Sequence, residues 1–217
     1  QRFTIEKAEL TLTAPENEVL TASFTGQNMP IPAPGVSGLQ KEGDEYTLTY
    51  TYTFTPAGSE EAQSPVESCK APEVSAAGIY EVKVTVPDTC KNYRATEAVT
   101  YTFRITSATQ RVELESSTEG WNAEQSTVSK TLGDVPFTVT GKGYVNDVVV
   151  NEKDISYEVT GENTQNPVVE VDQTSGQVTL LRAGSATITV TAEGSANYQK
   201  ATASYTITVD KGTPEVT

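Results

Sequence analysis

Residues 176–210 read GQVTLLRAGSATITVTAEGSANYQKATASYTITVD, and this stretch decides the fold class. It contains three runs, residues 178–180, 186–192 and 203–209, separated by a short and a longer turn. In the second and third runs apolar side chains occupy every other position: Ala186, Ile188, Val190 and Ala192, then Tyr205, Ile207 and Val209. Alternation with a period of two, with β-branched residues on both faces, indicates half-buried antiparallel strands.

The composition limits the classes of protein that the chain can belong to. Its 217 residues are enough for one large β domain or two of ordinary size, and no helical period persists anywhere. A net charge of −14 argues against nucleic acid and against anionic membrane surfaces as partners. The chain has no histidine, the commonest acid–base catalyst and metal ligand. It has no apolar run long enough to cross a bilayer and no visible signal peptide, so we expect part of a longer exported polypeptide.

Comparison of the chain with itself indicates a repeat of about one small domain. Residues 1–5, 101–105 and 205–209 resemble one another, and residues 90–96 match residues 196–202. A third pair of matching blocks begins with Ala-Gly, at positions 77–78 and 183–184. Three matched blocks in one order predict two tandem domains, residues 7–107 and 108–210.

The two ends of the chain follow from this repeat. Residues 1–6 are either the closing strand of a preceding copy or the beginning of the first strand of domain one. Residues 211–217 are a linker or the start of a next copy.

Further strands fill both domains. In domain one we predict strands at residues 8–14, 19–25, 46–54, 79–86 and 99–105, with a loop at residues 57–65. The strand at residues 46–54 is predicted to have an aromatic inner face: Tyr46, Leu48, Tyr50, Tyr52 and Phe54. In domain two we predict strands at residues 111–114, 137–140, 155–159 and 168–171, followed by the three runs above. Six or seven short strands per domain are typical of a β-sandwich.

The second half of domain two resembles a known family. Residues 168–190 read VVEVDQTSGQVTLLRAGSATITV, and residues 132–137 read LGDVPF. Both are similar to the bacterial immunoglobulin-like (Ig-like) group 2 repeat of the intimin and invasin type. Domain one shares only the closing hairpin and looks like a more distant Ig-like relative. The resemblance implies an all-β fold of two tandem Ig-like β-sandwiches from a surface protein, and it supplies no catalytic residues.

Cys69 and Cys90 are the only two cysteines. In an Ig-like strand order they flank strands that, if antiparallel, bring the start of one beside the end of the other. A disulfide there would be a local clasp that stabilises domain one by about 3 kcal/mol, and it would indicate an oxidising compartment. The alternatives are two free thiols or a metal pair, and a metal pair is disfavoured without histidine.

An Asn-Tyr pair recurs before the last strand of each domain, as Asn92-Tyr93 and Asn197-Tyr198. One interpretation is an exposed tyrosine platform for a sugar. The other is an asparagine in left-handed backbone geometry followed by a tyrosine that closes the end of the sandwich. Recurrence in both copies favours the structural interpretation.

Trp121 is the single tryptophan and lies in the polar segment Thr118–Asn122. An exposed ring there could stack on a pyranose or on a protein partner, which makes Trp121 a candidate ligand-binding residue. It could equally fold back over a sheet edge.

Acidic residues gather at Glu42 with Asp44 and Glu45, at Glu60 with Glu61, and at Glu170 with Asp172. None has the dense oxygen-ligand spacing of a calcium loop, so a solvated surface is expected and no metal or other cofactor is predicted.

No catalytic motif is present either, because no base accompanies the many serines and threonines and no phosphate loop occurs. We therefore predict no enzymatic activity. The sequence favours a structural or adhesive module of a surface-exposed or secreted bacterial protein, monomeric, with an unknown protein or glycan as partner. The alternative is a carbohydrate-binding accessory module of a glycan-utilisation system.

Overall fold

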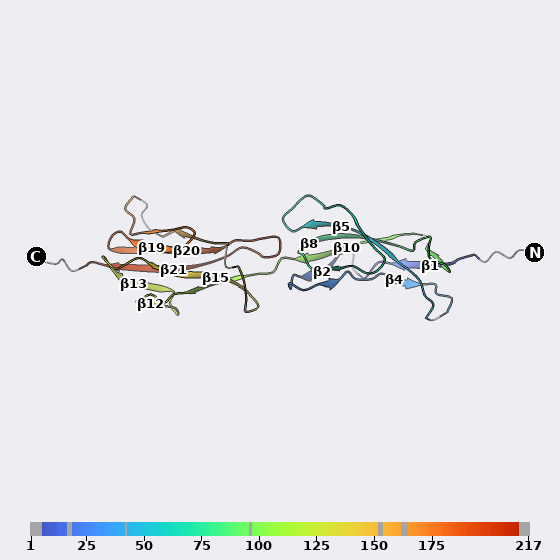
Figure 1. Ribbon diagram of the computed structural model, residues 1–217, viewed down its shortest axis with the longest axis horizontal. Helices are drawn as coiled ribbons and strands as arrows, with labels where there is room; N and C mark the ends of the chain where they lie inside the picture. Colours follow the sequence, from blue (N-terminus) through green and yellow to red (C-terminus); the bar gives the residue numbers. More distant parts are fainter. Residues whose placement is uncertain are drawn as a thin grey trace, which may run out of the picture. The chain divides into compact units, whose positions relative to one another are not determined.

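The computed structural model describes residues 6–16, 19–41, 43–95, 97–151, 154–161 and 165–212, without the side chains of Val19 and Asn151. Within these ranges the chain forms strands and no helix (Figure 1). No membrane-spanning helix is therefore found among the described residues. The chain divides into two compact units, Gln1–Ala108 and Thr109–Thr217. The predicted fold class, two tandem Ig-like β-sandwiches, is confirmed.

Unit 1 is built on a five-stranded sheet. In spatial order its strands are β2 (Val19–Ser23), β10 (Val99–Thr106), β8 (Gly78–Thr85), β5 (Thr49–Pro56) and β6 (Val66–Ser68). Alternate side chains of the three central strands point inward and form the core with Ile31 and Val74: Tyr50, Tyr80, Val82, Val84, Tyr101, Phe103 and Ile105. Full burial of each valine, isoleucine or phenylalanine among them contributes about 1.5–3 kcal/mol. Apolar and polar residues alternate along these strands with a period of two, and this alternation gives the sheet one buried face.

The opposite layer of unit 1 consists of short strands. One sheet has the order β4 (Gly35–Ser37), β1 (Ala8–Thr13) and β9 (Tyr93–Ala95), and a second pairs β3 (Met29–Pro30) with β7 (Glu73–Val74). Leu10, Cys90 and Tyr93 form a second, smaller buried cluster under the first of these sheets.

Unit 2 repeats this plan. Its five-stranded sheet has the order β12 (Trp121–Asn122), β13 (Thr127–Thr131), β21 (Ala201–Asp210), β20 (Gly184–Ala192) and β17 (Ile155–Val159). Strands β20 and β21 are the last two runs of residues 176–210, and they pair in antiparallel register from Gly184↔Val209 to Ala192↔Ala201. Their inward side chains are almost completely buried, as the alternation predicts.

Two three-stranded sheets complete unit 2. One has the order β11 (Arg111–Glu115), β15 (Thr140–Val145) and β16 (Val148–Asn151), and the other β14 (Phe137–Thr138), β19 (Gln177–Leu180) and β18 (Val169–Val171). Gly141 in β15 is buried, and a Cβ atom there would lie 2.5 Å from Cγ1 of Val190. The two layers pack closely at this point because glycine has no side chain.

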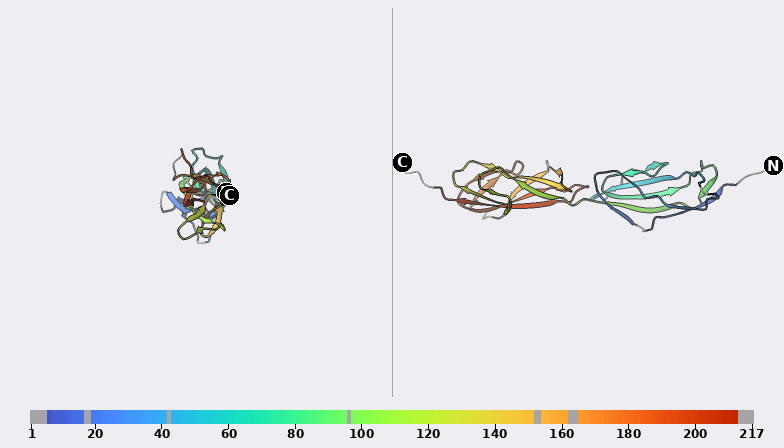
Figure 2. Two further views of the ribbon diagram at one scale, coloured as in Figure 1. Left: turned by 90° about the vertical axis from the view of Figure 1, so that its left-hand side faces the viewer. Right: turned by 90° about the horizontal axis from the view of Figure 1, so that it is seen from below.

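In each unit taken by itself, the chain enters at one end of the main sheet and leaves at the other (Figure 2). In unit 1 the N–H of Ala8 donates to the carbonyl of Asn92, beyond the end of β8, whereas Ile105 at the exit pairs with Gly78, the first residue of β8. In unit 2 the side chain of Gln110 donates to the carbonyl of Ala192, the last residue of β20, whereas the exit lies beside the start of β20.

The structure differs from the predicted strands in two ways. The strand expected at residues 46–54 begins at Thr49, because its partner β8 ends at Thr85, opposite Thr49. Tyr46 therefore lies before the strand and is 39% exposed instead of facing the core. Several short strands were not predicted: β3, β4, β6, β7 and β9 in unit 1, and β12, β13, β15 and β16 in unit 2. Polar residues or glycine interrupt the apolar alternation in β13 and β15, and β16 has three consecutive valines instead of an alternation.

Candidate functional site

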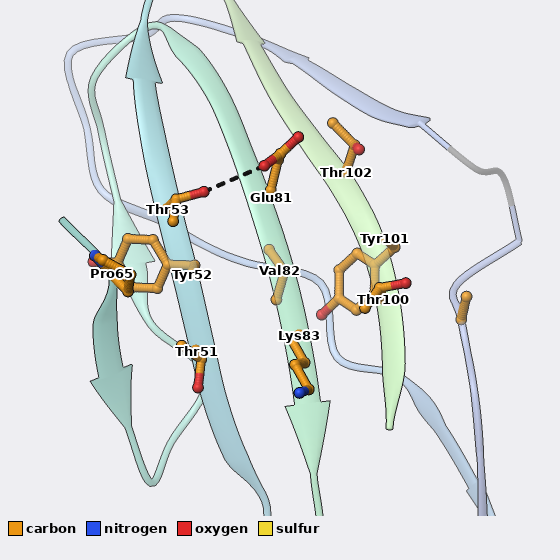
Figure 3. Close-up of a pocket in the computed structure, with 11 residues that line it drawn as sticks. Thr51, Tyr52, Thr53, Pro65, Glu81, Val82, Lys83, Thr100, Tyr101 and Thr102 are labelled. Atoms are coloured by element: carbon orange, nitrogen blue, oxygen red, sulfur yellow. Dashed lines mark hydrogen bonds between the residues drawn. The ribbon is translucent and has the colours of Figure 1, made fainter. Parts of the chain in front are cut away.

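A shallow hollow of about 630 Å³ lies on the outer face of the five-stranded sheet of unit 1 (Figure 3). Its side chains come from three neighbouring strands and form two rows across the sheet: Thr53, Glu81 and Thr102, then Thr51, Lys83 and Thr100. The hydroxyl of Thr53 donates to Oε2 of Glu81 over 3.5 Å. The hollow is thus a polar sheet face with one charge of each sign.

A second hollow, also of about 630 Å³, lies at the end of unit 1 where β8 ends and β5 begins. We call it the tip pocket. The loop before β5 contributes half of its lining and the loop between β8 and β9 the other half: Asp44, Glu45, Tyr46 and Thr47, then Thr89, Cys90, Lys91 and Asn92. Its volume lies within the range of about 300–1,000 Å³ that is usual for small-molecule sites.

Tyr93 joins the two loops of the tip pocket. Its side chain is only 2% exposed, and its hydroxyl donates to Oδ2 of Asp44 and accepts from the N–H of Gln40 over 3.0 Å. The hydrogen bond to the Asp44 carboxylate raises the pKa of Tyr93. The turn of the second loop is closed by a hydrogen bond from the N–H of Cys90 to the carbonyl of Pro87, 2.9 Å long. These hydrogen bonds hold the two loops of the pocket together.

The rim of the tip pocket has both signs of charge. Glu45, Tyr46, Lys91 and Asn92 are all exposed, and none of these side chains makes a hydrogen bond or ion pair with another residue of the described ranges. Elsewhere in unit 1, Arg94 pairs with Glu9 at 2.8 Å and Lys7 donates to the carbonyl of Asp88 at 2.6 Å. Donor and acceptor groups without a partner in the described ranges thus line one hollow.

No protein-family model and no curated protein matches this sequence. Solved structures match it at low identity. They include EC1-3 of Drosophila N-cadherin (12% identity, TM-score 0.33, 95% of this chain and 68% of that one) and a fragment of intimin bound to the intimin-binding domain of its translocated receptor (18%, 0.31, 95% and 64%). A SusE-like surface-located polysaccharide-binding protein of Bacteroides thetaiotaomicron matches at 13% identity and a TM-score of 0.32, over 95% of this chain and 34% of that one. The chain thus spans less than two thirds of the length of the last two.

The predicted disulfide between Cys69 and Cys90 is wrong, because both residues are free thiols. Strands β6 and β8 both pair with β5, on opposite sides of it. Strands β6 and β8 therefore lie two inter-strand spacings, about 9.5 Å, apart. A disulfide needs the Cα atoms of its two cysteines within about 7 Å of each other. Cys69 follows β6 and is exposed, whereas Cys90 is buried in the small cluster of unit 1.

Trp121 lies on the edge strand β12 and is half-buried against the core of unit 2. Its ring meets that of Tyr205 edge to face, with centroids 6.0 Å apart and an interplanar angle of 87°. The ring thus covers a sheet edge, and ligand binding by Trp121 stays a prediction.

The two Asn-Tyr pairs have different surroundings. Tyr93 closes the end of unit 1 and is buried, whereas Tyr198 is half-buried. The backbone N–H groups of Asn197 and Tyr198 both lie 3.2 Å from the hydroxyl of Ser195, to which they donate. The expected left-handed geometry of Asn92 and Asn197 is wrong, because neither has a positive φ. Left-handed non-glycine residues occur in the described ranges at Ser126, Asn146 and Asp147.

The predicted acidic clusters lie mostly on the surface. Glu60, Glu61, Glu170 and Asp172 are exposed, Asp44 is half-buried, and Glu42 lies outside the described residues. Asp172 accepts from the backbone and hydroxyl of Ser175 and the backbone of Thr174, and these hydrogen bonds lower its pKa. Among the described residues no group of three or more carboxylates or thiols is arranged to hold a metal ion.

The tip pocket was not predicted from the sequence. Tyr46 was expected on the core face of a strand, and no pattern connected residues 44–47 with residues 89–92. Only the recurring Asn-Tyr pair pointed to this place, and it gave no sign of the facing loop.

Proposed function

We propose that the chain is a non-enzymatic structural and adhesive module of a surface-exposed or secreted bacterial protein, located outside the cell. The observation that supports this most directly is the path of the chain through each unit, from one end of the main sheet to the other. Tension applied through the chain then loads each unit along its strands, as an in-line module requires. The net charge of −14 is consistent with an extracellular protein or glycan as partner and not with nucleic acid.

The strand pairing of unit 2 supports a load-bearing role. Strand β13 lies parallel to the last strand, β21, from Thr127↔Thr206 to Thr131↔Asp210. Outside this ladder, the N–H of Thr206 donates to Ser126 and the N–H of Leu132 donates to Asp210, over 3.0 and 2.9 Å. Tension along β21 shears this row of hydrogen bonds together instead of opening them one at a time. Unit 1 has the same device, because β2 lies parallel to β10.

The electrostatics also favour a non-enzymatic role. The pKa shifts found among the described residues belong mainly to tyrosines, with one turn aspartate and one surface arginine. Catalytic groups usually have shifted pKa values and converge in a cleft. Most of these shifts have structural causes, chiefly burial of tyrosines in the cores.

Force spectroscopy on the whole chain, held at its two ends, tests this function. We expect two unfolding events, one for each unit. In a parallel ladder every second residue of a strand hydrogen-bonds to the same neighbouring strand. Ser126 and Leu132 both bond to β21, so the N–H of Lys130, which lies between them at even spacing, also points toward β21. Lys130→Pro should lower the force of one event and leave the other unchanged.

Ser129→Pro is the matched control, because the N–H of Ser129 donates to Gly120 beside the edge strand β12, over 3.0 Å. It should lower the unfolding force less than Lys130→Pro. The load-bearing proposal fails if a Lys130→Pro variant that still melts cooperatively keeps the wild-type force.

A carbohydrate-binding accessory module remains the second candidate. The observation that favours it is the tip pocket, with its exposed tyrosine and its polar groups that have no partner among the described residues.

A further inference from the structure

The groups around the tip pocket restrict the chemistry of a ligand. Asp44 and Glu45 would repel an anion, and the ammonium group of Lys91, in the same lining, would repel a cation. The pocket offers both hydrogen-bond donors and hydrogen-bond acceptors. The amide of Asn92 can donate and accept, Lys91 only donates and Glu45 only accepts. An uncharged ligand whose groups both donate and accept hydrogen bonds fits these side chains of the tip pocket.

Tyr46 adds an apolar surface to these polar groups. The side chain is 39% exposed, and its hydroxyl has no hydrogen-bond partner in the described part of the chain. An aromatic ring with a free polar end suits a partner that is apolar on one face and polar at its edge. Pyranose rings have this character, with C–H groups on a face and hydroxyls around the rim.

We propose that the tip pocket binds a neutral saccharide, with one pyranose ring stacked on Tyr46. Asn92 and Lys91 donate to its hydroxyls, and Glu45 accepts from them. Asp44 takes a different part, because its carboxylate holds the Tyr93 hydroxyl and thereby positions the two loops. This inference deepens the proposed function by naming a site and a ligand class for adhesion, and it does not depend on load bearing.

The test begins with the full chain on an array of neutral gluco-, xylo-, manno- and galacto-oligosaccharides. Heparin and polygalacturonate serve as anionic probes, and a tetralysine peptide serves as the cationic probe. We expect binding to at least one neutral oligosaccharide and to none of the charged probes. The dissociation constant for the best neutral probe is then measured by titration calorimetry.

Variants locate the site. Tyr46→Ala should weaken binding about tenfold or more, as removal of a central aromatic contact usually does, whereas Tyr46→Phe keeps the ring and should retain most of the affinity. Asn92→Ala should weaken binding by a smaller factor. Trp121→Phe, in unit 2, tests the alternative site at Trp121 and should bind as the wild type does.

Three results would overturn the proposal: no neutral oligosaccharide binds, only the tetralysine peptide or the polyanions bind, or Tyr46→Ala binds as tightly as the wild type. Loss of binding in Trp121→Phe with full binding in Tyr46→Ala would assign the site to Trp121 instead. None of these results bears on the unfolding forces, so the two proposals can fail independently.

Discussion

At the scale of single residues, Tyr93 connects two loops of unit 1 through its hydroxyl. Tyr93→Phe keeps the buried ring but leaves the N–H of Gln40 and the carboxylate of Asp44 without this partner. We expect the free energy of unfolding of unit 1 to fall by about 1–2 kcal/mol, as measured by urea unfolding. Tyr46→Phe, in the same pocket, removes a hydroxyl without a described partner and should change it by less than about 0.5 kcal/mol. Equal effects of the two substitutions would contradict the role given to Tyr93.

Gly176 is required for two reasons that can be separated. Its φ is +69°, and a Cβ atom would lie 2.6 Å from the ring of Tyr157. That ring cannot move aside, because it is buried and its hydroxyl accepts from the N–H of Gly141 over 3.0 Å. Gly133 also has a positive φ, +109°, but has open space around it.

Substitution by alanine at both glycines therefore separates strain from overlap. We expect Gly133→Ala to destabilise unit 2 by about 1 kcal/mol, from backbone strain alone, and Gly176→Ala to cost a further 1–3 kcal/mol or so from overpacking. Trp121 fluorescence during urea unfolding measures both, since its ring packs on the core of unit 2. If the two variants unfold at the same urea concentration, the overlap at Gly176 is relieved at no cost.

At the scale of elements, the hairpin of β15 and β16 depends on its turn. Val145 pairs with Val148, and the two residues between them, Asn146 and Asp147, have φ values of 47° and 63°. Such a turn favours glycine, asparagine and aspartate. Asp147 also pairs with Arg111 at 2.8 Å, but its side chain is 92% exposed, so this ion pair contributes little.

Two substitutions of Asp147 remove that ion pair equally and differ only in the backbone that they tolerate. Asp147→Val should lower the unfolding free energy of unit 2 by about 1–2 kcal/mol, whereas Asp147→Gly should leave it unchanged within about 0.5 kcal/mol. Trp121 fluorescence again provides the measurement. Similar losses in both variants would instead assign the stability to the ion pair.

At the scale of the whole molecule, both cores are rich in tyrosine, and this predicts how stability depends on pH. Burial raises the pKa of Tyr80 in unit 1 to about 12, and it also raises the pKa of Tyr205 in unit 2. In the unfolded chain tyrosine loses its proton near pH 10. Above this pH the unfolded state releases protons that the folded state still holds, so stability is full below about pH 10 and falls as the pH rises toward 12.

Urea unfolding at about pH 8, 10 and 11 checks this dependence. Tyr205→Phe offers a sharper test in unit 2, because the Tyr205 hydroxyl is buried without a described hydrogen-bond partner. Its removal should leave stability at pH 8 unchanged or increased by about 1 kcal/mol and should reduce the loss at pH 11. A variant that loses as much stability at pH 11 as the wild type would rule out Tyr205 as a source of the alkaline effect.

The sequence by itself determined the fold class and the central strands of each main sheet. Alternation over residues 186–192 and 203–209 depends only on neighbours along the chain, and β20 and β21 follow it residue by residue. Strands such as β15 could not be recognised from the alternation. At the buried position 141 of β15 the residue is a glycine, which allows close packing between the layers, and no apolar side chain marks the position as buried in the sequence.

Only the tertiary structure decided which distant residues meet. Cys69 and Cys90 looked like partners in a linear strand order, but β5 lies between the strands that they follow. Residues 44–47 and 89–92 share no pattern in the sequence, yet Tyr93 brings them to one pocket. The physical reason is that periodicity records which side of a strand is buried, whereas strand order and loop contacts depend on packing between segments far apart in the chain.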